Sequence, residues 1–135
     1  MKVLIDTNVF FDVILKRQPF YNSSAKVLEL VDKGIEEYIS AAAVTDIYYL
    51  ACRDLKDREK VIALMNDVLE IAKIISVTEK EIFNAFDLNW KDFEDAVQYS
   101  AAVSNNIDAI ITRNMNSQAE VKILTPEEML DFIGG

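Results

Sequence analysis

The sequence lacks histidine altogether and contains a single cysteine, Cys52. Without histidine, the chain has no imidazole general base, no Ser-His-Asp triad and no His-ligated zinc site. One cysteine allows neither an internal disulfide nor a thiolate zinc site, and it is typical of a protein from a reducing cytoplasm. Any chemistry must therefore depend on carboxylates, amides, hydroxyls, lysines, arginines or that one thiol.

Glycine and proline are also scarce, with 3 and 2 residues among 135, which argues against linker-rich and low-complexity chains. No apolar run approaches the roughly 20 residues of a membrane span. Asp6 comes too early in the chain for a secretory leader. The length is that of one ordinary domain. We therefore expect a single cytoplasmic domain over residues 1–135, with no membrane partner.

Positive charge is in the minority, because 23 Asp and Glu residues face 14 Lys and Arg residues. The resulting net charge of −9 repels the phosphate backbone of a nucleic acid. A nucleic-acid partner would therefore require a local basic patch and a divalent cation.

Short apolar runs alternate with helix-compatible segments along the chain. The runs predict strands at 2–5, 38–40, 73–77, 108–112 and 121–124, and their unbroken apolar character is typical of strands buried on both faces. Helices are predicted over 9–15, from a cap at Ser23 or Ser24 to Lys33-Gly34, over 41–52, from Asp57, from a Thr78–Glu81 capping box, over 93–103 and from Thr125-Pro126. This order predicts an α/β fold in which helices cover both faces of a parallel sheet.

Polar residues follow two of the predicted strands at the point where each ends. Asp6-Thr7-Asn8 come after the first strand, and Thr112-Arg113-Asn114 come after the fourth. In open α/β sheets, ligands bind at the carboxyl ends of strands, near the point where the strand order reverses. These two segments are therefore the first candidates for a functional site.

Further acids lie next to apolar helical segments. Asp46 is surrounded by apolar neighbours, and a lone acid in such a setting needs a partner or a metal. Asp92 and Asp95 are three residues apart on one helix face, and we expect Glu94 to point away from it. Asp95 begins a long apolar run, so we expect it to face inward more than Asp92.

Acids that converge from separate elements repel one another. Two carboxylates about 4 Å apart cost on the order of 4 kcal/mol at an effective dielectric constant near 20. A hard dication such as Mg²⁺ or Mn²⁺ prefers oxygen ligands and offsets this repulsion. Such an ion can also activate a water molecule and stabilise charge on a phosphate, and this chemistry needs no histidine.

Four segments together resemble the PIN-domain family, and most closely its small single-domain members such as VapC-type toxins: VLIDTNVFFDVIL, ISAAAVTDIYYLA, DFEDAVQYSAA and DAIITRN. The resemblance extends over nearly the whole chain. It implies a three-layer α/β/α fold with a central parallel sheet of four to five strands. It also implies a Mg²⁺- or Mn²⁺-dependent endoribonuclease that cleaves RNA phosphodiesters, as the toxin of a toxin–antitoxin pair with an antitoxin protein as partner.

The resemblance also implies roles for individual residues. The acidic positions that bind metal are Asp6, Asp46 and Asp95, and the fourth catalytic position is Asn114. The supporting positions are Thr7, Asn8, Asp92 and Thr112. Arg113 is the residue expected to contact the substrate or a partner.

Three positions depart from the family pattern. Asp46 stands where Glu is more frequent, Asn114 where Asp is frequent, and Ser117-Gln118 where many relatives carry Asp-Phe. Asn114 removes one negative charge from the site. Asn114, the missing Asp-Phe and the net charge of −9 favour an alternative function, a catalytically weak PIN fold that binds nucleic acid or protein.

Purely structural roles for the same residues stay open at this point. Asp6 could be only the N-cap of a helix, and Asp46 could be solvated on a helix edge. Asp95 could pair with a surface lysine or arginine, and Asn114 could be a turn residue.

Two segments, 10–15 and 43–52, carry more large apolar groups than one helix face can bury. Phe11, Tyr48 and Tyr49 are the expected surplus, and large exposed apolar patches are rare on monomers. We therefore expect a homodimer, in which Arg113 with Lys16 and Arg17 would steer RNA toward the acidic site.

Overall fold

Five parallel strands form the centre of the computed structural model, which describes residues 1–115 and 120–134. The strands are β1 (Lys2–Ile5), β2 (Glu36–Ser40), β3 (Ala72–Ile75), β4 (Ala109–Ile111) and β5 (Lys122–Leu124), in the spatial order β3-β2-β1-β4-β5. Leu4 of the central strand lies in register with Tyr38 on one side and Ile110 on the other. The five predicted strands and their parallel pairing are confirmed. Ser117 and Gln118 lie outside the described residues.

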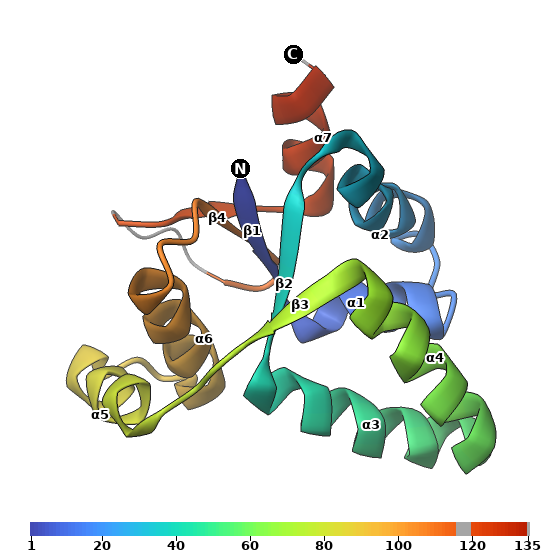
Figure 1. The fold of residues 1–135 in the computed structure, drawn as a ribbon, viewed down its shortest axis with the longest axis horizontal. Helices are drawn as coiled ribbons and strands as arrows, with labels where there is room; N and C mark the ends of the chain where they lie inside the picture. Colours follow the sequence, from blue (N-terminus) through green and yellow to red (C-terminus); the bar gives the residue numbers. More distant parts are fainter. Residues whose placement is uncertain (116–119, 135) are drawn as a thin grey trace.

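Helices cover both faces of this sheet (Figure 1). They are α1 (Thr7–Ile14), α2 (Tyr21–Leu28), the 3₁₀ helix η1 (Glu29–Lys33), α3 (Ala41–Leu55), α4 (Arg58–Ile71), α5 (Glu79–Leu88), α6 (Phe93–Ser104) and α7 (Pro126–Gly134). In Figure 1, α5 and α6 lie on one side of the sheet, and α1, α2, α3, α4 and α7 lie on the other. The predicted three-layer α/β/α fold is confirmed. No helix within the described ranges is long and apolar enough to span a bilayer.

The central strand β1 contributes to both halves of the core, because successive side chains of a strand point to opposite faces. Val3 and Ile5 pack in the cluster on the side of α1 to α4 and α7, whereas Leu4 packs with Tyr99 of α6 on the other side. All three β1 side chains are fully buried. This two-sided burial is the reason for the unbroken apolar run at the start of the sequence.

Most of the predicted helix boundaries are confirmed. Asp57 caps α4 by accepting a hydrogen bond from the Lys60 amide, and the Thr78–Glu81 capping box begins α5. Gly34 ends η1 with φ of 88°, a left-handed conformation that glycine adopts without strain.

The predicted cap at Ser23 or Ser24 is wrong, because α2 begins earlier, at Tyr21, and has Phe20 as its N-cap residue. Ser24 lies inside the helix and is buried there. Its hydroxyl donates a hydrogen bond of 2.8 Å to the buried carboxylate of Asp12. A tertiary partner therefore uses the hydroxyl that the sequence pattern assigned to a cap.

The three aromatic residues expected as surplus have different environments. Phe11 is only 4% exposed and belongs to the buried core cluster, so its assignment to the surface is wrong; its helix α1 contacts α2 and α3. Tyr48 is half-buried, and its hydroxyl accepts a hydrogen bond from Arg58 Nε. Tyr49 is 71% exposed, as predicted.

Candidate active site

A cleft of about 550 Å³ opens at the carboxyl ends of β1 and β4, where the strand order reverses. The two strand ends are joined directly, because the Asp6 amide donates a hydrogen bond of 3.0 Å to the Ile111 carbonyl. The cleft is lined by Asp6, Thr7, Asn8, Phe11, Arg17, Asp46, Tyr49, Leu50, Asp92, Glu94, Asp95, Gln98 and Asn114. Both predicted strand-end segments therefore contribute to one site, as the switch-point rule leads one to expect.

The carboxylate of Asp6 is the most heavily hydrogen-bonded group in the cleft. Its Oδ1 accepts from the Thr7 amide at 2.7 Å and from Gln98 Nε2. Its Oδ2 accepts from Thr112 Oγ1 at 2.7 Å and from Asn8 Nδ2 at 2.9 Å. Asp6 is thus the N-cap of α1 and a member of the site at once, and the two interpretations of this residue do not exclude each other.

The neighbours of Asp6 leave several oxygen atoms without partners. Thr7 Oγ1, Asn8 Oδ1 and Gln98 Oε1 are buried and have no hydrogen-bond partner among the described residues. Buried polar atoms are normally satisfied by protein, water or an ion. Three acceptor oxygens around one buried carboxylate are an arrangement that a hydrated cation can satisfy.

The acids predicted in two helical regions also line this cleft. Asp46 reaches it from α3, and Asp95 reaches it from the first turn of α6. Asp92 is the N-cap of α6, where its side chain accepts a hydrogen bond of 3.1 Å from the Asp95 amide. Asp92 therefore caps α6 and lines the cleft as well.

The expectation that Glu94 points away is wrong, because Glu94 lines the cleft. Residues 94, 95 and 98 lie on one face of α6, since three- and four-residue spacings bring helix residues together. A hydrogen bond shared with Asp46 is the largest cause that raises the pKa of Glu94 to about 7. Burial and the surrounding negative charges, that of Asp6 included, act in the same direction.

The pKa of Asp95 is also raised. Burial raises the pKa of this half-buried carboxyl to about 6, and the negative charges of Asp92 and Asp6 add to the effect. Two acids with raised pKa values in one cleft indicate an excess of negative charge there. Such perturbation is more frequent at functional sites than elsewhere.

In their present conformations, no three Asp, Glu or Cys side chains of the described residues are grouped so that they could hold a metal ion. The chemistry of the donors nevertheless suits a hard dication. The cleft offers carboxylate and amide oxygens, orphaned acceptor oxygens and raised carboxyl pKa values, and Mg²⁺ and Mn²⁺ bind such oxygens.

Asn114 lies at the rim of the cleft, in the turn after β4. Its backbone amide donates a hydrogen bond of 3.2 Å to Thr112 Oγ1, and the same hydroxyl donates to Asp6 Oδ2. Thr112 therefore links the turn to Asp6 through these two hydrogen bonds. Asn114 is both a turn residue and a cleft residue.

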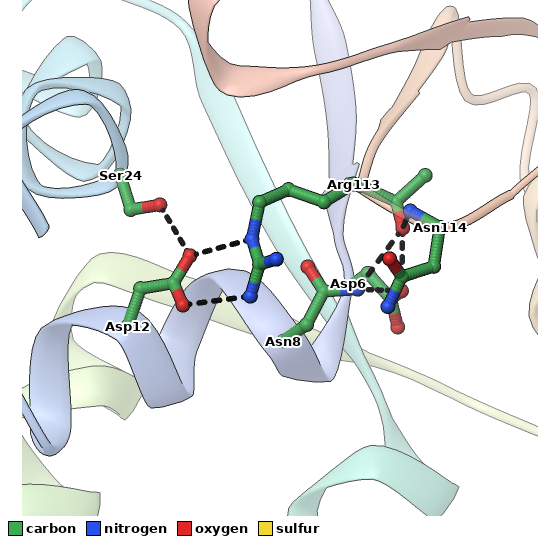
Figure 2. Close-up of polar contacts among 7 residues, drawn as sticks. Asp6, Asn8, Asp12, Ser24, Arg113 and Asn114 are labelled. Atoms are coloured by element: carbon green, nitrogen blue, oxygen red, sulfur yellow. Dashed lines mark hydrogen bonds and ion pairs between the residues drawn. The ribbon is translucent and has the colours of Figure 1, made fainter. Parts of the chain in front are cut away.

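Arg113 has a partner within the chain (Figure 2). Its Nε and Nη2 atoms donate hydrogen bonds of 3.0 and 2.9 Å to the two carboxylate oxygens of Asp12 on α1. The guanidinium also lies over the Phe20 ring, 3.8 Å from its centroid. With its side chain 18% exposed, Arg113 is an intramolecular clamp between the β4 turn and α1. The predicted contact with substrate or a partner stays untested.

The sequence matches the profile of the family described as PIN domain over residues 2–116. This chain belongs to the PIN-domain family. It is 26% identical over 137 residues to Ribonuclease VapC1 of Aquifex aeolicus (strain VF5), an alignment that covers 96% of this chain and 94% of that protein.

Solved structures share the fold of this PIN domain. VapBC2 from Rickettsia felis, bound to a DNA fragment from its promoter, matches with a TM-score of 0.74 and 21% identity over 93% of this chain and 98% of that chain. VapC20 of Mycobacterium tuberculosis, a toxin that cleaves the sarcin–ricin loop, matches with a TM-score of 0.65 and 12% identity over 80% and 86% of the two chains. These similarities establish the fold.

Gln98 is the main residue of this PIN domain that the sequence interpretation missed. It is 3% exposed, and it connects α6 to Asp6 across 92 positions of the chain. A signal was present, because Gln98 is a polar residue within the apolar run of α6 and follows Asp95 by three positions. Its partner could not be identified from that spacing.

Proposed function

We propose that this PIN domain is a Mg²⁺- or Mn²⁺-dependent endoribonuclease that cleaves RNA phosphodiesters, and that it is the toxin of a toxin–antitoxin pair. The observation that carries the proposal is the acidic cleft, which gathers carboxylates from the β1 end, α3 and α6 around one strand-order switch point. The similarity to Ribonuclease VapC1 supports the reaction class. The likeness to VapBC complexes supports the pairing with an antitoxin.

Asp6, Asp46 and Asp95 are the residues that would hold the ion, and Asn114 is a neutral oxygen donor at the rim. When bound, Mg²⁺ or Mn²⁺ would supply an acidified water and would stabilise negative charge on the scissile phosphate. Four hydrogen bonds hold Asp6 in one orientation. Glu94 can hold a proton near neutral pH beside Asp46, which lowers the charge of the cleft when no ion is present.

A cleavage assay on single-stranded RNA tests the proposal. The wild type should cut RNA in millimolar Mg²⁺ or Mn²⁺ and should stop when EDTA is added. Asp95→Asn should lower the rate by at least about 100-fold, because even residues that only orient metal ligands are worth about 10- to 100-fold. Asp67→Asn on the exposed surface of α4 is the matched control and should leave the rate unchanged.

Two outcomes of that assay would count against the proposal. Cleavage that persists in EDTA would reject the metal requirement. RNA binding without cleavage under any divalent ion would favour the alternative, a catalytically weak binding module. Duplex DNA in a parallel reaction tests whether the substrate class is RNA.

We also propose that residues 1–135 act as one domain in the cytoplasm and that the protein forms a homodimer. Exposed aromatic residues support the homodimer: Tyr49 of α3 is 71% exposed, and Phe83 and Phe86 of α5 are 59% and 61% exposed. Phe86 lies against Phe93 of α6, with ring centroids 4.6 Å apart. Phe83 and Phe86 are three residues apart on one face of α5, and large exposed apolar patches are rare on a monomer.

Sedimentation equilibrium of the wild type and of Phe86→Glu tests this association. A dimer that the variant dissociates without loss of helical circular dichroism would support the proposal. A clean monomer of the wild type at high micromolar concentration would reject it. The proposed antitoxin partner is tested by co-expressing this protein with the product of the adjacent gene and measuring whether the two co-purify.

A further inference from the structure

Three cations were candidates for contacting RNA near the cleft: Lys16, Arg17 and Arg113. They differ in whether their side chains already form an ion pair within the chain. The ion pairs among the described residues are Arg113–Asp12 and Arg53–Asp54, so neither Lys16 nor Arg17 has a carboxylate partner in that part of the chain.

Arg113 is poorly suited to a phosphate. Two of its nitrogen atoms already donate to the fully buried carboxylate of Asp12, which also accepts from Ser24 Oγ (Figure 2). Withdrawing the guanidinium would leave a buried charge uncompensated, and the cost of that state opposes any exchange of partners.

Arg17 is the only cation among the described residues that line the acidic cleft. Its backbone is held at both ends, because its amide donates to the Asp12 carbonyl at 2.9 Å and its carbonyl accepts from the Tyr21 amide at 2.7 Å. Its guanidinium carbon lies 5.3 Å from the centroid of the buried Phe11 ring, within the range of a cation–π contact. An anchored but unpaired guanidinium therefore borders the cleft.

The position of Arg17 is complementary to that of the acids. Arg17 follows α1, whereas Glu94 and Asp95 belong to α6, and these two helices lie on opposite faces of the sheet (Figure 1). A nucleic-acid strand that crosses the cleft would pass Glu94 and Asp95 on one side, and the only positive charge of the described lining, Arg17, on the side of α1 and α3. Arginine suits this role, because its planar fork donates two hydrogen bonds to one phosphate.

We propose that Arg17 binds a backbone phosphate of the single-stranded RNA substrate next to the scissile one, while Arg113 serves only as the clamp on Asp12. This assignment rests on the proposed ribonuclease function. Arg17 is then a substrate-binding residue that contributes to RNA affinity and fixes the position of the RNA strand in the cleft.

Fluorescence anisotropy with a labelled single-stranded RNA, at several salt concentrations in Ca²⁺, tests the assignment. Arg17→Gln should weaken binding by about 10-fold. It should also reduce the slope of log Kd against log salt by about 0.7, the value expected for one lost phosphate contact on a single strand. Arg17→Lys should keep most of the slope. Lys16→Gln is the matched control, since it removes the same charge one residue away and outside the cleft lining.

The wild type and all variants are also assayed for cleavage in Mn²⁺, with melting temperatures to verify folding. Arg17→Gln should raise KM with little change in kcat. Equal effects of Arg17→Gln and Lys16→Gln would overturn the assignment, because only long-range charge would then matter. If the wild type cleaves RNA and Arg17→Gln binds RNA as tightly as the wild type, the assignment of Arg17 is wrong and the proposed function is unaffected. A folded wild type that neither binds nor cleaves RNA would overturn both.

Discussion

Replacing Glu37 by glutamine should stabilise the protein above about pH 5, by an amount that grows as the pH rises. Glu37 lies on β2 and is 2% exposed, and both of its carboxylate oxygens are buried without a hydrogen-bond partner among the described residues. Burial is the largest influence and raises the pKa of Glu37 from 4.5 to about 8. The backbone of Val31 is the next largest influence and lowers the pKa, and the charge of Asp32 is a smaller influence that raises it.

The sign of the pH dependence follows from comparing the folded and unfolded states. Below pH 4.5 the carboxyl is mostly protonated in both states, so it contributes little to the pH dependence of stability. Between pH 4.5 and about 8 the unfolded chain ionises while the folded protein keeps Glu37 neutral, so stability falls as the pH rises. Each pKa unit corresponds to about 1.4 kcal/mol, which gives a loss of about 3 kcal/mol at pH 7 and about 5 kcal/mol above pH 8.

Urea denaturation of the wild type and of Glu37→Gln from about pH 5.5 to 8.5 measures this loss. Because other groups titrate too, the quantity to plot is the difference in unfolding free energy between the two proteins. That difference should rise by about 1.4 kcal/mol per pH unit in favour of the glutamine variant and level off above about pH 8. The slope m should stay the same, since the surface exposed on unfolding does not change.

Glu36→Gln is the control, because Glu36 is the adjacent residue of β2 and is exposed to solvent. Its difference from the wild type should stay flat across the same pH range. A flat difference for Glu37→Gln as well would refute the reasoning, since it would mean that Glu37 is ionised in the folded protein or hydrated there.

Three further predictions concern the clamp, the cleft and a helix cap. Arg113→Met should lower the unfolding free energy by about 3–5 kcal/mol in urea denaturation, because it leaves the buried carboxylate of Asp12 without its partner; a loss below about 1 kcal/mol would contradict a buried ion pair. Mn²⁺ should raise the melting temperature more at about pH 7.5 than at about pH 5.5, because a proton competes for Asp95, whose pKa is raised to about 6; equal shifts at both pH values would exclude that competition. Thr78→Ala should cost about 1 kcal/mol in thermal or urea unfolding, because it removes the hydroxyl of the capping box of α5, and it should leave RNA cleavage unchanged.

Local patterns in the sequence were sufficient to predict most helices and strands of this fold. β1 and β4 are short apolar runs followed by polar residues, and several helix starts carry their own capping residues, such as Asp57 and Thr78. These features depend on neighbours within a few positions, so they can be recognised without knowing the tertiary structure. The placement of Asp6 at a strand end, and hence at the candidate site, follows from the same local information.

The partners of buried polar side chains were decided only by the tertiary structure. Arg113 meets Asp12 across 101 positions, and Gln98 meets Asp6 across 92. The sequence marks such residues as polar, but the chain packing determines whether each one meets a carboxylate, solvent or the cleft. The same reason explains why Glu94 was expected outside the site and Phe11 on the surface, although Glu94 lines the cleft and Phe11 is buried in the core. Burial and pairing are properties of long-range contacts, and residue types and short spacings do not encode them.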